Sequence, residues 1–219
     1  MNTEAEQIIH VVDDDPPFLA AIGRALEVLE LPVRQYPRAR QCMEALDPDQ
    51  GGCLITDLRM PDLDGLGFQQ WLNERHCPLP VIFITGHGDT DTAVKALKRG
   101  ALDFLRKPFR EEDLLACVRK ALCLERENRQ RARDEREARR RFAELTPREQ
   151  EVLKLVVAGC ANKVIARHLV ISPRTVEHHR KHVMLKMQAR STSDLLTLAV
   201  LCGVYRLSLD DDRGEYLGD

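Results

Sequence analysis

Four short apolar segments in the first half of the chain each end at a charged or hydroxyl-bearing residue. The segments and their ends are 8–12 with Asp13-Asp14-Asp15, 53–56 with Asp57, 81–84 with Thr85, and Phe104-Leu105 with Arg106-Lys107-Pro108. Uniformly apolar runs of this length are typical of strands buried on both faces of a parallel sheet. Open α/β sheets gather their chemistry beyond the carboxyl ends of the strands. We therefore expect the residues at these four ends to form one site.

Helical patterns alternate with the predicted strands. Pro16-Pro17 fits a helix start, and Leu19, Ile22 and Leu26 follow at helical spacing. Residues 33–36 add a further strand, and the other predicted helices are 39–46, 66–72, 92–100 and a fifth that begins near Glu111. This alternation predicts a doubly wound parallel sheet of five strands with right-handed crossovers.

The fifth helix has no sequence signal that would end it before Pro147. Glu125–Arg129, Glu127–Arg131 and Glu135–Arg139 are spaced i,i+4 in the favourable orientation. Apolar residues nearly vanish beyond Leu124, so the stretch 125–142 is interpreted as a solvated helical linker. The alternative, a two-stranded coiled coil, would need apolar residues at the a and d positions.

A second, all-helical region follows the linker. An apolar helix around 152–158 stops at Gly159, and Asn162 is a candidate N-cap for a short helix over 163–169. Ser172 and Pro173 then fit the N-cap and first position of a helix over 174–187. Two helices joined by a tight turn, the second of them basic, form the helix-turn-helix pattern. A last helix is expected over 192–202.

Charge separates the two regions. Residues 1–109 carry a net charge of -6 and residues 141–207 carry +6, so the rear region is suited to binding nucleic acid.

The seven cysteines are odd in number and form no C-x-x-C pair, which favours reduced thiols in a cytoplasmic protein over a zinc site or a disulfide framework. The N-terminus is not apolar enough for a signal peptide, and the acidic tail 208–219 is expected to be disordered.

The predicted front site has a definite chemistry. Asp13, Asp14 and Asp57 would repel one another without a cation, and carboxylate oxygens with open water positions suit Mg²⁺. With Lys107 and the Thr85 hydroxyl, such a site would neutralise a phosphoryl group on one carboxylate. Asp57, on the central strand, is the expected acceptor. An acidic loop end taken alone more often marks a helix cap, and Asp15 is expected to be one.

Sequence motifs in both regions resemble those of a known family. Residues 1–124 resemble the receiver domain of two-component response regulators, and residues 143–207 look like a LuxR-type helix-turn-helix; together they look like the FixJ subgroup of the NarL/FixJ family. The motifs that carry the resemblance are Val11-Val12-Asp13-Asp14, Thr56-Asp57-Leu58-Arg59-Met60-Pro61, Ile84-Thr85-Gly86, Lys107-Pro108-Phe109, Leu145-Thr146-Pro147-Arg148-Glu149, Asn162-Lys163 and Ile171-Ser172-Pro173-Arg174-Thr175-Val176.

The resemblance implies a strand order of 2-1-3-4-5 and phosphorylation of Asp57 by a sensor histidine kinase. It implies Mg²⁺ held by Asp14, Asp57 and the Arg59 backbone carbonyl, with Asp13 assisting, and a usually cis Lys107–Pro108 peptide. It also implies a switch that pairs Thr85 with an aromatic residue, here Phe104. Because Phe104 has no hydroxyl, we expect that readout to be steric. A homodimer face is expected at Val94, Leu97, Lys98 and Arg106, with further contacts on the last helix.

The expected DNA contacts lie on the helix over 174–187. Arg174, Arg180 and Lys181 are suited to phosphates, while Thr175, Glu177, His178 and Lys181 lie where they could reach base edges; Ser172 caps the helix. Glu177 departs from the lysine of some relatives. It either accepts a hydrogen bond from cytosine or pairs with Lys181 at i,i+4, and both interpretations stay open.

His179 and His182 are interpreted as surface or core residues without a ligand. For His178 a DNA contact and a purely structural role are equally favoured.

Two other functions are alternatives to a DNA-binding regulator switched by phosphorylation. A phosphohydrolase with an aspartyl-phosphate intermediate usually has a second Asp two residues after the nucleophile. Arg59 stands at that position, which argues against an enzyme. DNA binding without phosphorylation is disfavoured by the intact acidic site. The expected partners are therefore a histidine kinase, operator DNA with two half-sites, and a second copy of the chain.

Overall fold

The computed structural model describes residues 7–47, 50–86 and 100–205. The chain divides into two compact units, residues 1–129 and 130–219, and each is described by itself. No described helix is both long enough and apolar enough to cross a bilayer.

The first unit is built on a parallel five-stranded sheet with the order β2-β1-β3-β4-β5. The strands are β1 (Ile8–Val12), β2 (Val33–Tyr36), β3 (Gly52–Asp57), β4 (Val81–Thr85) and β5 (Asp103–Arg106). β1 and β4 are buried along their whole length, as uniformly apolar strands require. The predicted sheet and its strand order are confirmed.

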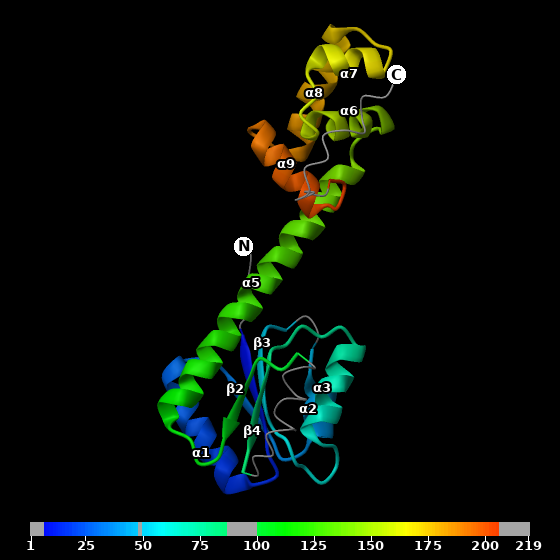
Figure 1. The fold of residues 1–219 in the computed structure, drawn as a ribbon. Coiled ribbons are helices and arrows are strands. Elements are labelled where there is room, and N and C mark those ends of the chain that lie inside the picture. The colour runs from blue at the N-terminus through cyan, green and yellow to red at the C-terminus, as the bar shows by residue number, and fades with distance from the viewer. Residues whose placement is uncertain (1–6, 48–49, 87–99, 206–219) are drawn as a thin grey trace. The chain divides into compact units, whose positions relative to one another are not determined.

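Helices cover both faces of this sheet (Figure 1). The helices of the first unit are α1 (Pro16–Leu26), η1 (Glu27–Leu29), α2 (Ala39–Ala45), α3 (Gly65–Glu74) and the first part of α5 (Glu111–Ala143). One apolar cluster packs α1 and α5 against β1, β3 and β4, through Leu26, Leu114 and Val118 among others. A second cluster packs α2 and α3 against the opposite face, around Phe68 and Phe83.

The register of the sheet brings the four polar strand ends to one edge. Val12 lies beside Thr56, Asp57 beside Ile84, and Thr85 beside Arg106. The residues that end or follow these strands therefore emerge together, as the sequence pattern predicts. The predicted helix over 92–100 falls in residues 87–99, outside the described residues, except for Gly100, whose φ of +92° suits glycine.

α5 is one continuous helix from Glu111 to Ala143. Two of the three predicted i,i+4 pairs form, Glu125–Arg129 at 2.7 Å and Glu135–Arg139 at 3.7 Å. The Glu127–Arg131 pair does not form in the part of the chain that the structure describes. Glu127 instead accepts from the Cys123 thiol at 3.6 Å.

The second unit is all-helical, with α6 (Pro147–Val157), α7 (Asn162–His168), α8 (Pro173–Met187) and α9 (Thr192–Leu201). A single apolar cluster joins them, with Val152, Ile165, Val176 and Met187 fully buried. Ser172 caps α8 by accepting from Thr175 N, as predicted. The prediction for Asn162 is wrong, because Ala161 is the N-cap of α7 and Asn162 is its first residue.

Candidate functional site

Two carboxylates and one ammonium meet at the carboxyl edge of the sheet. Lys107 Nζ donates to Asp13 Oδ2 at 2.6 Å and to Asp57 Oδ2 at 3.0 Å. Asp13 follows β1, Asp57 ends β3, and Lys107 follows β5. The sheet thus brings Asp13 and Lys107, 94 positions apart in the sequence, within hydrogen-bonding distance. We call Asp13, Asp57 and Lys107 the strand-edge site.

Burial and charge act against each other at this site. Asp13 is 1% exposed, and burial raises the pKa of its carboxyl although hydrogen bonds from Lys107 and from the Asp15 backbone N–H lower it. Burial also lowers the pKa of the Lys107 ammonium, but the two carboxylates outweigh burial and raise it. Lys107 is therefore held charged between two anions, which is the electrostatic setting that a phosphoryl group on one of them needs.

The backbone holds Lys107 and Asp57 in place. Lys107 N donates to Thr85 O at 2.8 Å, and the Lys107–Pro108 peptide is cis, as the family resemblance implies. Arg59 N donates to Asp57 Oδ1 at 3.0 Å, which leaves Oδ2 of Asp57 facing Lys107. The Asp57 carboxylate is thus oriented by one neighbour on each oxygen.

The other predicted residues of this site lie around it. Asp14 and Arg59 are exposed, Thr85 is 1% exposed, and Phe104 is half-buried against the cluster that contains Phe83. Arg106 is exposed on β5, while Val94, Leu97 and Lys98 lie outside the described residues. Asp15 is the N-cap of α1, accepting from Phe18 N, as predicted.

The donor set fits a magnesium ion. Two carboxylates, those of Asp13 and Asp57, contact a single ammonium at this edge, so negative charge is in surplus, and the exposed Asp14 follows Asp13 in the chain. Within residues 7–47, 50–86 and 100–205, no three His, Cys, Asp or Glu side chains converge closely enough to cage a metal by themselves. Mg²⁺ does not require such a cage, because it keeps several waters and uses one or two carboxylates plus phosphate oxygens.

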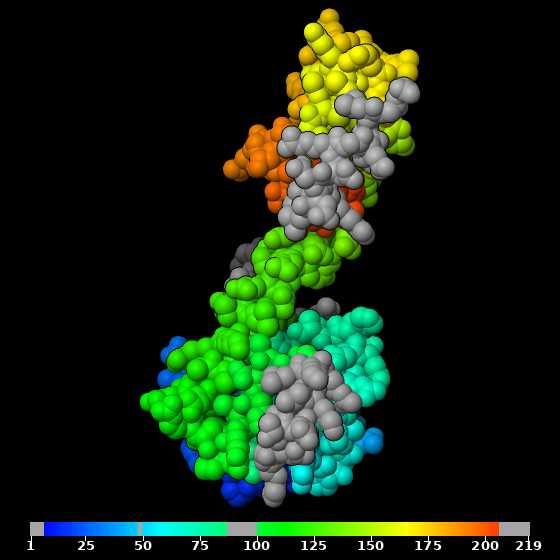
Figure 2. All heavy atoms as spheres, in the orientation of Figure 1, coloured from blue at the N-terminus to red at the C-terminus, as the bar shows by residue number. Residues whose placement is uncertain are grey.

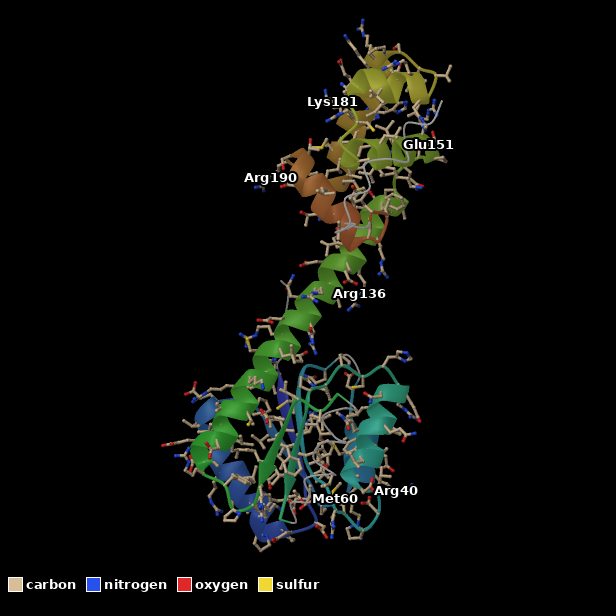
Figure 3. The ribbon with its side chains drawn as sticks, in the orientation of Figure 1. Arg40, Met60, Arg136, Glu151, Lys181 and Arg190 are labelled. Carbon is tan, nitrogen blue, oxygen red and sulfur yellow. The ribbon has the colours of Figure 1, made fainter. Side chains whose placement is uncertain are left out.

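α8 presents the second candidate site. Val176, Val183 and Met187 are buried, while Arg174, Glu177, His178 and Lys181 are exposed and form what we call the exposed face of α8. Figure 2 shows the segment that holds α7 and the start of α8, in yellow, at the surface of the second unit, and Figure 3 shows Lys181 on the outside of α8. An exposed, polar second helix in a helix-turn-helix is the element that enters a major groove.

Contacts within the second unit separate the predicted DNA-binding residues into two kinds. Arg180 donates to Asn162 Oδ1 on α7 at 2.9 Å, and Thr175 is held by Ser172, whose Oγ lies 2.8 Å from Thr175 Oγ1. Glu177 and Lys181, by contrast, form no ion pair with each other in the part of the chain that the structure describes. Their side chains are therefore available to an incoming ligand.

A buried ionic group was missed by the sequence interpretation. Glu149, 3% exposed, closes a capping box with Thr146 and accepts from Lys186 Nζ at 2.6 Å. His182 Nδ1 lies 3.5 Å from the other Glu149 oxygen, and the rings of His178 and His182 are 4.2 Å apart. The signal for the cap was present in Thr146-Pro147-Arg148-Glu149, because Thr and Glu three residues apart ahead of an apolar run mark a capping box.

Comparisons with known proteins assign each of the two parts of the chain to a family. The family model described as the response regulator receiver domain matches residues 9–119, and the one described as bacterial regulatory proteins of the luxR family matches residues 143–199. Fold and sites thus define a class of protein, the response regulators of two-component systems that carry a DNA-binding domain. The chain belongs to the FixJ-like response regulators with a LuxR-type helix-turn-helix, which are transcription regulators.

Several relatives cover nearly the whole chain. It is 43% identical over 196 residues to the transcriptional regulatory protein FixJ of Azorhizobium caulinodans, covering 90% of this chain and 93% of that one. It is 41% identical over 194 residues to the response regulator protein TodT of Pseudomonas putida, with coverages of 89% and 86%. Among solved structures, the response regulator StyR matches with a TM-score of 0.79 at 37% identity, covering 90% of this chain and 99% of that one. Full-length FixJ from B. japonicum matches with a TM-score of 0.56 at 37% identity, covering 91% of this chain and 98% of that one.

Proposed function

We propose that Asp57 accepts a phosphoryl group from a sensor histidine kinase and that this modification controls how the exposed face of α8 binds operator DNA. The observation that carries the proposal is the 3.0 Å contact between Lys107 Nζ and Asp57 Oδ2 at the carboxyl edge of the sheet. It places one ammonium beside the carboxylate that ends the central strand.

The transfer follows from the groups at the site. A carboxylate oxygen of Asp57 attacks the phosphorus of a phosphohistidine, the P–N bond breaks, and the leaving imidazole takes up a proton. Lys107 stabilises the charge on the transferring oxygens, and the Thr85 hydroxyl lies at the adjacent strand end to donate to one of them. Asp14, Asp57 and the Arg59 carbonyl, assisted by Asp13, would hold Mg²⁺, which would supply further charge neutralisation when bound.

The site is proposed to accept a phosphoryl group on Asp57 and not to catalyse the turnover of external substrates. Arg59 occupies the position two residues after Asp57 where aspartyl-phosphate hydrolases place an acid/base carboxylate. An arginine cannot deprotonate an attacking water, because its guanidinium stays charged in proteins. The chain is therefore proposed to be a switch and not an enzyme.

The output is proposed to be operator binding by a dimer. Phosphorylation would draw Thr85 toward Asp57 and let Phe104 turn inward, changing the surface that includes Val94, Leu97, Lys98 and Arg106. Two paired chains would present two α8 helices to major-groove faces about 10 base pairs apart. Inverting a 1:99 population takes about 5.5 kcal/mol, which a few charge-assisted hydrogen bonds of about 1.5–3 kcal/mol each can supply.

The division of labour along the chain is proposed as receiver 1–124, helical linker 125–142, DNA-binding domain 143–207 and acidic tail 208–219. The start of the luxR-family match at residue 143 supports the limit of the DNA-binding domain, and the two units separate after Arg129, within the proposed linker. The cytoplasm is the proposed location, since the seven cysteines are free thiols and the proposed ligand is DNA.

Mg²⁺-dependent labelling by a small phosphodonor tests the proposal. Asp57→Asn conserves volume but removes the nucleophile, so label is expected to vanish while the fold persists. Asp134→Asn, an exposed carboxylate change on α5, is the matched control and is expected to label fully. Full labelling of Asp57→Asn would place the acceptor elsewhere.

A further inference from the structure

Lys107 has a third neighbour that the phosphoryl chemistry does not account for. Its Nζ lies 3.5 Å from the centre of the Phe18 ring while it donates to Asp13 and Asp57. An ammonium has three N–H donors, and here two go to carboxylates while the face of an aromatic ring lies against the cation. Phe18 belongs to the first turn of α1, a different element from those that supply the strand-edge site.

Phe18 is fixed on several sides. Its backbone N–H donates to the Asp15 cap, which secures the first turn of α1. Its ring meets Phe109 edge-on, with centroids 6.2 Å apart and planes at 87°, and packs on the apolar cluster under α1 and α5. Phe109 lies two residues beyond Lys107, so the segment that carries the lysine also supplies the ring that packs against Phe18.

The contact matters because lysine is flexible. Four rotatable bonds let a lysine ammonium wander, and a side chain must be ordered before it can stabilise a developing charge. Attraction between a cation and the negative face of an aromatic ring strengthens when the pair is withdrawn from water, and the Lys107 side chain is only 22% exposed. An aliphatic side chain at position 18 would fill space without attracting the cation.

We propose that Phe18 is a positioning residue for phosphoryl transfer, holding the Lys107 ammonium against Asp13 and Asp57 by cation–π attraction. The inference rests on the proposed function of Asp57. Phe18 contacts the Lys107 ammonium, so it acts through the position of that ammonium. The feature that carries the inference is the simultaneous contact of one ammonium with two carboxylates and one ring.

The first experiment compares Phe18→Tyr and Phe18→Leu in the full-length chain. Tyr keeps the ring and Leu keeps only apolar bulk. With a small phosphodonor and Mg²⁺, the rate of phosphoryl uptake is expected to stay within about threefold for Tyr and to fall about tenfold for Leu. Equal rates for Leu and the natural chain would overturn the proposal.

A readout independent of phosphorylation comes from NMR of the metal-free protein. The ring face over Lys107 should shift its ε-methylene protons upfield by ring current, in the natural chain and in Phe18→Tyr. Phe18→Leu should return them to ordinary lysine values. Unshifted ε protons in the natural chain would mean that the ring does not hold Lys107, whatever the labelling rates show.

Fluorinated phenylalanines at position 18 separate electrostatics from shape. Successive fluorines weaken the negative face of the ring and change its size little, so uptake is expected to decline step by step with fluorine number. A flat series would overturn the cation–π contact even if Phe18→Leu were slow. If the natural chain takes up no phosphoryl group, the proposed function fails, while the NMR shift still decides whether Phe18 positions Lys107.

Discussion

Glu149, at the start of α6, and Lys186, near the end of α8, are joined by a 2.6 Å charge-assisted hydrogen bond across 37 residues of sequence. The same carboxylate closes the capping box of α6 through Thr146. Burial would raise the pKa of the Glu149 carboxyl, but hydrogen bonds from Lys186 and Thr146 outweigh burial and lower it to about 2. One buried carboxylate thus ties the first helix of the DNA-binding domain to its recognition helix.

Glu149→Gln is expected to destabilise the protein by about 1–3 kcal/mol, because the amide keeps the volume but loses the charge that Lys186 meets. Urea unfolding followed by circular dichroism measures the loss. Glu151→Gln, which removes an exposed carboxylate paired with Arg148, is the control and is expected to change stability by less than about 0.5 kcal/mol. Equal losses of stability for the two changes would show that the buried Glu149–Lys186 pair contributes no more than an exposed ion pair.

The same carboxylate predicts a pH dependence. Its pKa is depressed on folding, so its contribution is complete above the ordinary glutamate value of 4.5 and is lost as pH falls toward 2. Glu149→Gln should therefore lose less stability than the natural chain between pH 5 and pH 3. Parallel stability curves over this interval would contradict the assignment.

His10 predicts acid sensitivity in the receiver. It is 1% exposed on β1, with Tyr36 Oη 3.3 Å and Cys42 Sγ 4.0 Å from its Nδ1. Burial, assisted by the nearby Arg34 charge, lowers its pKa from 6.5 to about 4. The unfolded chain binds the proton first, so stability falls as pH drops from about 6.5 toward 4, by about 2 kcal/mol at pH 5.

Unfolding in urea at pH 7 and pH 5 measures this effect. His10→Leu, of similar volume, should remove most of the difference between the two pH values. His76→Asn is the control, because His76 is exposed and its φ of 54° is tolerated by asparagine. A pH difference that survives His10→Leu unchanged would assign the acid sensitivity to another group.

Lys181 and Arg180 are expected to differ in DNA binding. Lys181 is exposed on α8, so Lys181→Ala should weaken binding to a selected operator and reduce the salt slope by about one unit. Arg180 is half-buried and donates to Asn162, so Asn162→Ala, which releases the Arg180 guanidinium from α7, should reproduce part of the Arg180→Ala loss. Fluorescence anisotropy across salt concentrations is the measurement, with Lys154→Ala on α6 as control. An unchanged salt slope for Lys181→Ala would show that Lys181 does not contact a phosphate.

Glu177 is expected to read sequence. Its carboxylate is exposed and unpaired with Lys181 within the described residues, and a glutamate can accept from cytosine N4. Selection of DNA fragments with Glu177→Ala should relax the preference at one base pair and leave overall affinity within about tenfold. Recovery of the same ranked sites would end the base-reading role.

Sequence reasoning recovered what local pattern determines. The five strands, the Asp15 and Ser172 caps and the meeting of Asp13, Asp57 and Lys107 follow from apolar runs, cap residues and the rule that parallel strands end at one edge. The Phe18–Lys107, Glu149–Lys186 and Asn162–Arg180 contacts did not follow. Each joins two elements through side chains whose directions depend on packing. The N-cap expected at Asn162 failed for the same reason, because its amide is used by Arg180 on another helix.

The central claim is that Asp57 controls assembly and DNA binding, and sedimentation with a phosphoryl mimic tests it most directly. The full-length chain would be sedimented with and without beryllofluoride and Mg²⁺, and its operator affinity measured in the same two samples. The account predicts a monomer that binds DNA weakly without the mimic and a dimer that binds tightly with it, while Asp57→Asn stays monomeric in both. The same mass and the same affinity in both samples of the natural chain would contradict it.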